Sequence, residues 1–389
     1  MEGPVEEDAP HVVDRRTLAL GVRLLIRQTV ETDSPRDDPE IATCDGHRVN
    51  SRPLNIAQVV ASSGAGGLEK HVGELCEELV KAGHGVTVIA PPEFTRQLPR
   101  GIEGRAVRLD RGRHDPRSLL ALTRTLRGLD CDIVHAHATK AAFMTGFIRP
   151  LLRCPTVATL HNVKRSPSAY RMHDHVIAVS RTLAREFSPG RVSVIYHGIR
   201  TRETVPMDLR TLFNLPPEHP VLLAVGRLVP AKGFDVLIEA VSGLPVSLLI
   251  AGDGPTQPYL AAAAEKCGES TAIRFLGHRN DIPSLMAHSD AVVISSRREG
   301  FSYVFAEAAL LKRPVLSTDV PVPNEVLPSD LIVKTDSAVA LRQRLQQLLG
   351  DISHWNETME PVYRFAEQQL SLNAMTEKTL ATYRKIIGR

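Results

Sequence analysis

The chain alternates short apolar, β-branched runs with longer segments of helical periodicity, and this alternation strongly limits the folds open to it. The first unit opens at Leu54 with "LNIAQVVA", passes through the small-residue turn "SSGAGG", and returns after Gly83 as "GVTVIA". Between them, one helix face carries Leu68, Val72, Leu75, Leu79 and Val80. A strand, a helix and a second strand in this order require a parallel sheet with a right-handed crossover.

The same pattern continues and then restarts. Further strands are expected at 105–109, 133–137, 156–160, 175–179 and 192–196. After the Pro-rich break "NLPPEHP", strands are expected at 221–226, 246–251, 272–276, 291–295 and 314–318. Such continuous apolar runs suit strands buried on both faces. Because 389 residues exceed one ordinary core, we predict an α/β protein with two Rossmann-like, doubly wound parallel-sheet domains.

The composition changes along the chain suggest where these domains begin and end. Residues 1–52 are rich in charge, Pro and Asp, with one apolar stretch at 18–26 that Arg23 interrupts. We interpret them as a poorly ordered extension with one short helix, a membrane-surface helix being the alternative. The predicted domains are then 53–205 and 206–360, and residues 361–389 are expected to be helical.

Overall composition excludes several classes of function. The formal net charge is only +3 and the aromatic content only 4%, so the chain is not expected to form a basic surface with aromatic side chains for base stacking. Nucleic acid is therefore not an expected partner. The five cysteines, Cys44, Cys76, Cys131, Cys154 and Cys267, are far apart and form no CxxC pair, which argues against a disulfide framework or a zinc site. The acidic start and the lack of a run of about 20 apolar residues predict a cytoplasmic protein.

Two cations follow the first strand of the second half. Strand 221–226 runs into "GRLVPAKG", which places Arg227 and Lys232 in the loop after it. Ligands of doubly wound folds bind at the carboxyl ends of strands, and these two side chains suit a diphosphate, although solvated loop charges are the alternative. The later turn "AGDGP" contains Gly252 and Gly254, which permit close backbone approach.

The segment "RREGFSYVFAEAALLKRPV" carries the densest chemistry. Glu299 stands in a loop, Gly300 makes a turn, and Ser302 is placed to cap a helix that carries Glu307. The first-turn N–H groups of that helix suit a phosphate, and the two carboxylates suit sugar hydroxyls. Solvated glutamates are the alternative, but the apolar neighbours of Glu307 predict a buried face, on which a carboxylate must be paired.

Taken in order, these motifs resemble the retaining glycosyltransferases of the GT-B fold, glycosyltransferase family 4. The resemblance spans about residues 54–350. It rests on the E-x7-E pair Glu299 and Glu307, on "GRL" with Lys232 and Gly233, and on "GxGP", "FLG" and "D-x-x-x-x-S" near 290–295. In the first half, "GGLEKHV", "VHAHATKA", "TLHN" and "VIAVS" resemble the family's elements.

The resemblance implies a role for each matching residue. Arg227 and Lys232 would bind the donor diphosphate, Glu307 the ribose, and Glu299 hydroxyls of the transferred sugar. His161 would lie beside the reacting sugar; Arg227, Lys232, Glu299 and His161 are the expected catalytic set. The remaining expected donor contacts are Gly66, Gly67, Gly254, His278 with Arg279 by the nucleobase, the backbone of Gly300, Phe301 and Ser302 at the sugar, and the backbone near Tyr303 and Val304 at a phosphate.

The resemblance also implies an architecture and a reaction. The two domains would face a cleft, with a C-terminal helix crossing back to the first. A hexose would pass with retention from a nucleotide sugar, UDP-linked by preference or GDP- or ADP-linked, to a glycan or glycolipid acceptor of surface polysaccharide or lipopolysaccharide synthesis. The departing phosphate would take the acceptor proton. Because Arg227 and Lys232 would neutralise the leaving group, neither a metal nor another cofactor is expected.

Some features fit other interpretations. Asp130 and Asp132 could bind a metal but precede strand 133–137, which favours a strand-entry turn; His173 and His175 lead into a buried strand. His197–Arg200 replaces the family's Asn-Gly-Val-Asp, and with Arg298 it predicts extra positive potential near the cleft. Nine arginines in 96–127 suggest an anionic membrane surface at the inner face of the plasma membrane, or an ordinary solvated face.

Three rival classes remain. A nucleotide-sugar epimerase would share the fold and the donor but gives no reason for "GGLEKHV" and "EGFS". A dinucleotide dehydrogenase requires G-x-G-x-x-G, and this turn has Glu69 at the third glycine. A non-catalytic GT-B scaffold would not need Arg227, Lys232, Glu299 and Glu307 together.

Overall fold

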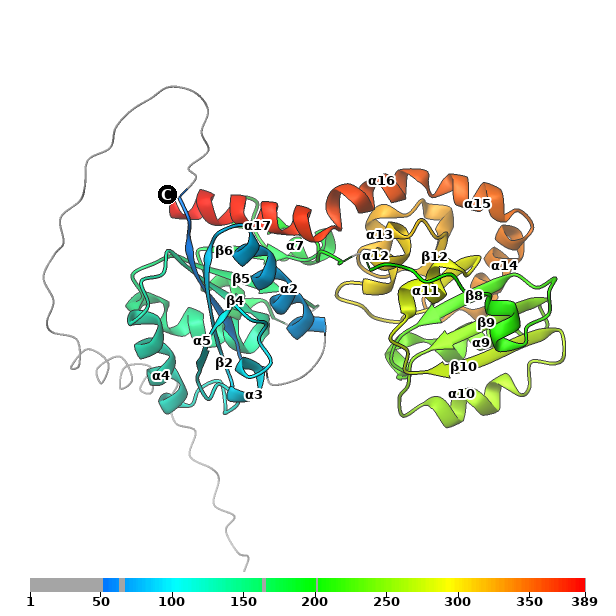
Figure 1. Cartoon of the computed structure of the whole chain (residues 1–389), viewed down its shortest axis with the longest axis horizontal. Coiled ribbons are helices and arrows are strands. Elements are labelled where there is room, and N and C mark those ends of the chain that lie inside the picture. Colours follow the sequence, from blue (N-terminus) through cyan, green and yellow to red (C-terminus); the bar gives the residue numbers. More distant parts are fainter. Residues whose placement is uncertain (1–51, 63–66, 163–165, 201, 389) are drawn as a thin grey trace, which may run out of the picture.

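The computed structural model describes residues 52–62, 67–162, 166–200 and 202–388, which form two lobes side by side (Figure 1). The predicted N-terminal extension falls outside these residues apart from Arg52, and so does Gly66. Each lobe is built on one parallel sheet with helices packed against it. Among the described residues, no helix has both the length and the apolar character that crossing a membrane requires.

The first domain contains a seven-stranded parallel sheet in the order β3-β2-β1-β4-β5-β6-β7. Its strands are β1 (Asn55–Val60), β2 (Gly85–Ala90), β3 (Glu103–Ala106), β4 (Ile133–His137), β5 (Thr156–Leu160), β6 (His175–Ala178) and β7 (Val192–Val194). Its helices are α2 (Gly67–Lys81), α3 (Pro92–Thr95), α4 (Pro116–Arg127), α5 (Ala138–Ile148), α6 (Ser168–Arg171) and α7 (Arg181–Ala184), with a 3-10 turn at Arg149–Leu151. Strands β4, β5 and β6 are buried throughout, as continuous apolar runs predict.

The second domain repeats the architecture with six parallel strands in the order β10-β9-β8-β11-β12-β13. The strands are β8 (Val221–Val225), β9 (Val246–Ala251), β10 (Thr271–Gly277), β11 (Ala291–Ile294), β12 (Val315–Thr318) and β13 (Ile332–Val333). The helices are α8 (Leu209–Phe213), α9 (Phe234–Val241), α10 (Gln257–Ala264), α11 (Ile282–Ala287), α12 (Tyr303–Leu310), α13 (Pro323–Val326) and α14 (Ala338–Leu349), with 3-10 turns at Pro230–Lys232 and Ser329–Leu331. The fold class predicted from the sequence is therefore confirmed.

The predicted strands match the observed ones closely except near the edges of the sheets. The run 105–109 was expected as a strand, whereas β3 covers Glu103–Ala106 and is exposed along its whole length. β3 is an edge strand with a single neighbour, so its position depends on pairing with β2 rather than on burial. The expected strand 192–196 is also shorter, because pairing with β6 ends at Val194.

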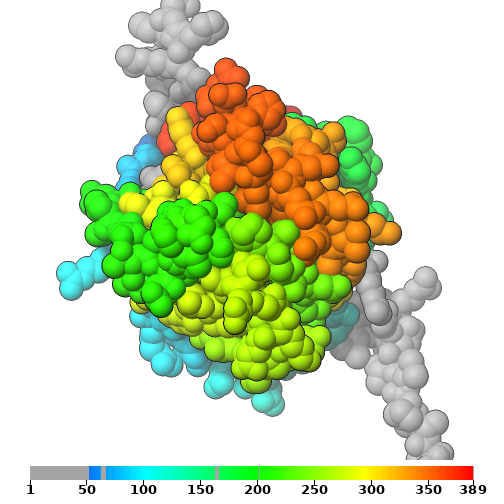
Figure 2. Space-filling view, turned by 90° about the vertical axis from the view of Figure 1, so that its right-hand side faces the viewer, coloured from blue at the N-terminus to red at the C-terminus, as the bar shows by residue number. Residues whose placement is uncertain are grey.

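The C-terminal helices return from the second domain to the first. α15 (Ile352–Thr358) and α16 (Glu360–Gln369) lie on the second domain, and α17 (Leu372–Ile387) lies on the first (Figure 1). Figure 2 views the molecule from the second domain, where α14 and α15, in orange, cover its upper part. The crossing passes Ile199, whose N–H donates to Leu370 O at 2.8 Å. Inside the first domain, Tyr383 Oη lies 2.6 Å from His135 Nδ1.

One carboxylate joins the two domains away from that crossing. Glu325 on α13 accepts hydrogen bonds from the N–H groups of Arg181 and Thr182, both at 2.8 Å, at the start of α7. It also accepts from Thr182 Oγ1 at 2.8 Å and from Tyr196 Oη at 3.0 Å. A carboxylate from one domain thus satisfies the open helix terminus of the other, which fixes their relative position at this edge.

Candidate active site

The strand orders place two switch points opposite each other. In the first sheet, β1 and β4 are neighbours whose following helices lie on opposite sides, and β8 and β11 have the same relation in the second sheet. Ligands of open α/β sheets bind where the strand order reverses, outside the carboxyl ends of the strands. The loops after β8 and β11 carry Arg227, Lys232 and Glu299, and the ends of β4 and β5 carry His137 and His161.

A cavity of about 330 Å³ lies between these strand ends. Both domains line it, with Gly67, Leu68, Ala138, His161, Asn162, Tyr170 and His197 from the first and Glu299, Gly300, Phe301 and Tyr303 from the second. Gly300 lies so close to the first domain that a Cβ there would come within 2.3 Å of His161 O. Gly300 therefore has no room for a side chain, and the expected sugar-contact residues of both domains meet in one space.

Lys232 and Glu299, expected to bind different parts of a donor, contact each other. Lys232 Nζ lies 2.5 Å from Glu299 Oε1, and both side chains are largely buried. Ser296 Oγ donates to the same carboxylate oxygen at 2.8 Å. The loops after β8 and β11 thus hold a charge pair at the carboxyl ends of these two strands. There the ammonium can contact a phosphate and the carboxylate can contact a hydroxyl.

Arg227 and Gly254 occupy the neighbouring loops. Arg227 is exposed, and its guanidinium has no ion-pair partner in the described part of the chain. Gly254 has a φ of +155°, and a Cβ there would lie 2.3 Å from Leu228 O. Gly254 is therefore needed for packing of the β9 loop against the β8 loop, which carries Arg227.

Helix α12 begins as the sequence predicted. The Ser302 side chain accepts from Phe305 N–H and caps the helix. Phe301 is buried, and Val304 in the first turn of the helix is half-buried. Tyr303 crosses the gap between domains, since its hydroxyl donates to Gly67 O at 3.0 Å, and its burial raises the pKa of the phenol.

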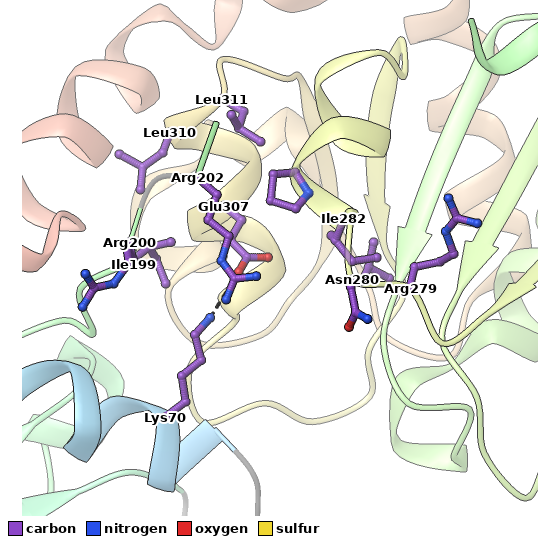
Figure 3. Close-up of a pocket in the computed structure, with 12 residues that line it drawn as sticks. Lys70, Ile199, Arg200, Arg202, Arg279, Asn280, Ile282, Glu307, Leu310 and Leu311 are labelled. Carbon is purple, nitrogen blue, oxygen red and sulfur yellow. Dashed lines mark ion pairs between the residues drawn. The ribbon is translucent and has the colours of Figure 1, made fainter. Parts of the chain in front are cut away.

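Glu307 lines a second cavity between the domains, of about 220 Å³ (Figure 3). Lys70 reaches from α2 of the first domain toward this carboxylate, with Nζ 3.6 Å from Glu307 Oε1. Burial raises the pKa of Glu307, and the Lys70 ammonium acts in the opposite direction. Arg279 and Asn280 line the same cavity, whereas His278 is exposed and does not. In the loop between β10 and α11, the residues that line the cavity are therefore 279 and 280.

Arg200 lines the Glu307 cavity, but acidic partners offset the positive potential predicted for it. Arg200 NH2 lies 2.5 Å from Glu77 Oε2 and 3.6 Å from Glu78 Oε1, and Glu74 is also within ion-pair range. The acidic face of α2, which the sequence does not place near residue 200, neutralises this charge. Arg298 is exposed in the β11 loop.

The two sequence motifs considered for metal binding have structural partners. Asp132 accepts from Asn55 N–H at 2.7 Å and ties the start of β4 to β1, which confirms the strand-entry turn. His173 Nε2 bonds Ala142 O at 2.8 Å, while His175 Nε2 bonds Ser193 Oγ at 2.9 Å. These two histidines thus support different elements.

Several residues of the site were not found from the sequence. Lys70 lies in the motif "GGLEKHV", but nothing in the sequence pairs it with Glu307. His71, His137 and His197 gather near His161, with a ring nitrogen of His137 3.3 Å from one of His161. The doublet "VHAH" was a visible signal, because alternate residues of a buried strand point to one face.

Two facing Rossmann-like domains, with cations and a paired glutamate at one switch point and a helix glutamate beside it, define a glycosyltransferase of the GT-B fold. The first domain matches the model of "Glycosyltransferase Family 4" over residues 65–203. The second matches that of "Glycosyl transferases group 1" over residues 209–360. The chain belongs to this family of glycosyltransferases and is an enzyme.

Individual relatives are similar over most of their length. The lipopolysaccharide core biosynthesis glycosyltransferase LpsE of Rhizobium meliloti is 28% identical over 333 residues, which cover 81% of this chain and 95% of LpsE. The crystal structure of Anabaena HepE in complex with UDP superposes with a TM-score of 0.72 at 22% identity, covering 85% of this chain and 100% of HepE. The lipopolysaccharide galactosyltransferase WaaB gives a TM-score of 0.68 at 17% identity over 85% and 100% of the two chains.

Proposed function

We propose that this enzyme transfers a hexose with retention from a UDP-sugar to a glycan or glycolipid acceptor in surface polysaccharide or lipopolysaccharide synthesis. The observation that carries the proposal is the pair of cavities between the two domains, one lined by Glu307 and Arg279 and one by Glu299 and His161. The name of LpsE supports the acceptor class, and the complex of HepE with UDP supports the nucleotide.

The proposed transfer uses position and charge. Glu307 accepts hydrogen bonds from the ribose, and Arg227 and Lys232 face the diphosphate. The α12 N-terminus adds its dipole. Charge develops on the leaving phosphate as the sugar bond breaks, so cations held in place stabilise the transition state more than the ground state. The departing phosphate oxygen accepts the acceptor proton, and the new bond forms on the face that the nucleotide leaves.

A donor panel followed by product analysis tests this function. We expect nucleotide release from a UDP-hexose to exceed release from GDP- and ADP-hexoses, and NMR of the product to show the donor's anomeric configuration. Inversion at the anomeric carbon would contradict the retaining mechanism. Interconversion of the nucleotide sugar without transfer would identify an epimerase, and no turnover of any donor would favour a scaffold.

Transfer should not depend on a divalent ion. Arg227 and Lys232 supply the positive charge that a metal supplies in other transferases. We therefore expect dialysis against EDTA to leave the rate of nucleotide release unchanged or raised. Loss of transfer that added magnesium or manganese restores would refute this expectation.

We propose that the arginine-rich surface of the first domain attracts the anionic lipid headgroups around its acceptor. Some of its charge is already neutralised, since Arg105, Arg108 and Arg111 pair with Glu103, Asp110 and Asp115. Arg100, Arg117 and Arg124 are exposed and have no ion pair within the described residues. Arg113 is also exposed without an ion pair, but its guanidinium lies over the Phe143 ring. Arg100, Arg117 and Arg124 are therefore the arginines left to meet a surface.

Liposome co-sedimentation separates the two groups of arginines. Replacing Arg100, Arg117 and Arg124 by Ser should weaken binding to anionic liposomes at least about tenfold, since each contributes on the order of 1 kcal/mol. The matched variant, with Ser at the three paired arginines Arg105, Arg108 and Arg111, should lose less. Binding to neutral liposomes of equal strength, or none to anionic liposomes at low salt, would show this surface to be ordinary.

A further inference from the structure

Four histidines from four elements of the first domain converge behind the transfer cavity. His71 lies on α2, His137 ends β4, His161 follows β5 and His197 follows β7. The ring centroids of His71, His137 and His161 lie 5.1 to 5.7 Å apart. Three imidazole rings at nearly equal separations enclose a common point, which is the arrangement that a shared ion requires.

We propose that His71, His137 and His161 bind one divalent late transition-metal ion, with Zn²⁺ as the representative. One ring nitrogen of each lies within 4.8 Å of those of the other two. His137 Nδ1 and His161 Nε2 are 3.3 Å apart. Zn–N bonds of about 2.0–2.1 Å at tetrahedral angles separate two ligand nitrogens by roughly 3.4 Å. The spacing of this pair needs almost no adjustment.

Gln58 orients the central ligand. His137 Nε2 lies 2.7 Å from Gln58 Oε1, and Gln58 Nε2 donates to Tyr383 Oη at 3.3 Å. Because the amide oxygen only accepts, the His137 proton must be on Nε2, and its Nδ1 lone pair faces His161. A histidine that binds a metal through one ring nitrogen usually donates the N–H of the other nitrogen to an acceptor, which fixes the ring's orientation.

His71 and His137 are buried, and the form of an imidazole that binds a metal is the neutral one, which offers a lone pair on the ligating nitrogen. The neighbouring His135 is no ligand, because Tyr383 and Thr159 contact its two nitrogens.

His197 contacts two of the three ligands without completing the set. Its Nδ1 is 2.6 Å from His71 Nδ1, and its Nε2 is 3.3 Å from His161 Nδ1. If His71 and His161 bind the ion through Nε2, both ring protons point at His197, and a neutral imidazole can accept only one of them. Ion binding should therefore turn His197 away from one ligand. His161 and His197 line the transfer cavity, so the ion should inhibit transfer; this consequence rests on the proposed function, whereas ion binding does not.

Isothermal titration of the full chain with ZnCl₂, together with thermal denaturation, tests the site. Wild type should bind one equivalent at micromolar zinc and unfold at a higher temperature with zinc. His71→Gln and His137→Gln should each weaken binding about a hundredfold, the upper range for losing even an outer-shell partner. His197→Asn should still bind zinc. Cys131→Ser should also still bind it; this control removes one thiol of the pair Cys131 and Cys154, whose sulfurs lie 3.4 Å apart.

Circular dichroism must show that the glutamine variants fold. Absence of zinc binding by wild type, or unchanged binding by folded His71→Gln and His137→Gln, would overturn the site. Loss of binding in His197→Asn would overturn the choice of the three ligands. In the transfer assay, zinc should inhibit wild type more than His71→Gln. Failure of that assay alone, with binding intact, would count against the proposed link to function and not against the metal site.

Discussion

Replacing Arg227 or Lys232 by Ala should lower kcat about a hundredfold or more while donor KM changes much less. The leaving diphosphate gains charge as the glycosidic bond breaks, so a missing cation raises the transition state most. Lys232→Ala should have the larger effect, because it also leaves the Glu299 carboxylate without the ammonium 2.5 Å away. Steady-state release of UDP measures both constants.

The control for these variants is Arg364→Ala, which removes an exposed arginine from α16 on the outside of the second domain. Its kcat and KM should match wild type. Arg227→Lys should recover part of the rate, since charge returns without the planar fork. Near-normal turnover by both Ala variants would show that neither residue contacts the diphosphate.

The two glutamates of the E-x7-E pair should fail in different ways. Glu299 lines the sugar cavity and Glu307 the neighbouring one, so Glu299→Gln should reduce kcat and Glu307→Gln should raise donor KM. Loss of a hydrogen bond to a charged group costs about 1.5–3 kcal/mol, or roughly 10- to 150-fold. Ribose contacts act on ground state and transition state alike, so they appear in KM.

A donor-binding titration with UDP alone separates these effects from misfolding. Glu307→Gln should weaken UDP binding, whereas Glu299→Gln should not weaken it, because UDP lacks the transferred hexose that Glu299 contacts. Lys70→Ala offers a matched test from the other domain, since its ammonium lies 3.6 Å from Glu307. Equal loss of UDP affinity in both glutamine variants would contradict the separate roles.

The architecture was largely predictable from the sequence because buried parallel strands leave an uninterrupted apolar signal. β4, β5 and β9 begin and end at the predicted residues. The bounds of the edge strand β3 were not predictable, because all its residues are exposed and its position depends on pairing with β2. Ser302 was recognisable as a cap because a cap acts on the residues that directly follow it.

Contacts between distant segments could not be predicted. The Lys232–Glu299 pair joins residues 67 positions apart, and Lys70 meets Glu307 across the two domains. Arg200 appeared cationic in the sequence because its acidic partners lie on α2, more than a hundred residues earlier. Local pattern identifies an element and its faces, but the partner of a charge depends on how the elements pack.

The return of α17 to the first domain determines the order in which this protein can mature on the ribosome. Its residues Leu372, Met375, Leu380 and Tyr383 belong to the same apolar cluster as β1, β2 and α2. The ribosome makes that helix only after the whole second domain. The first domain therefore emerges with part of its core uncovered, contrary to the usual domain-by-domain order. Nascent chains should need protection of this face until residue 387 leaves the exit tunnel.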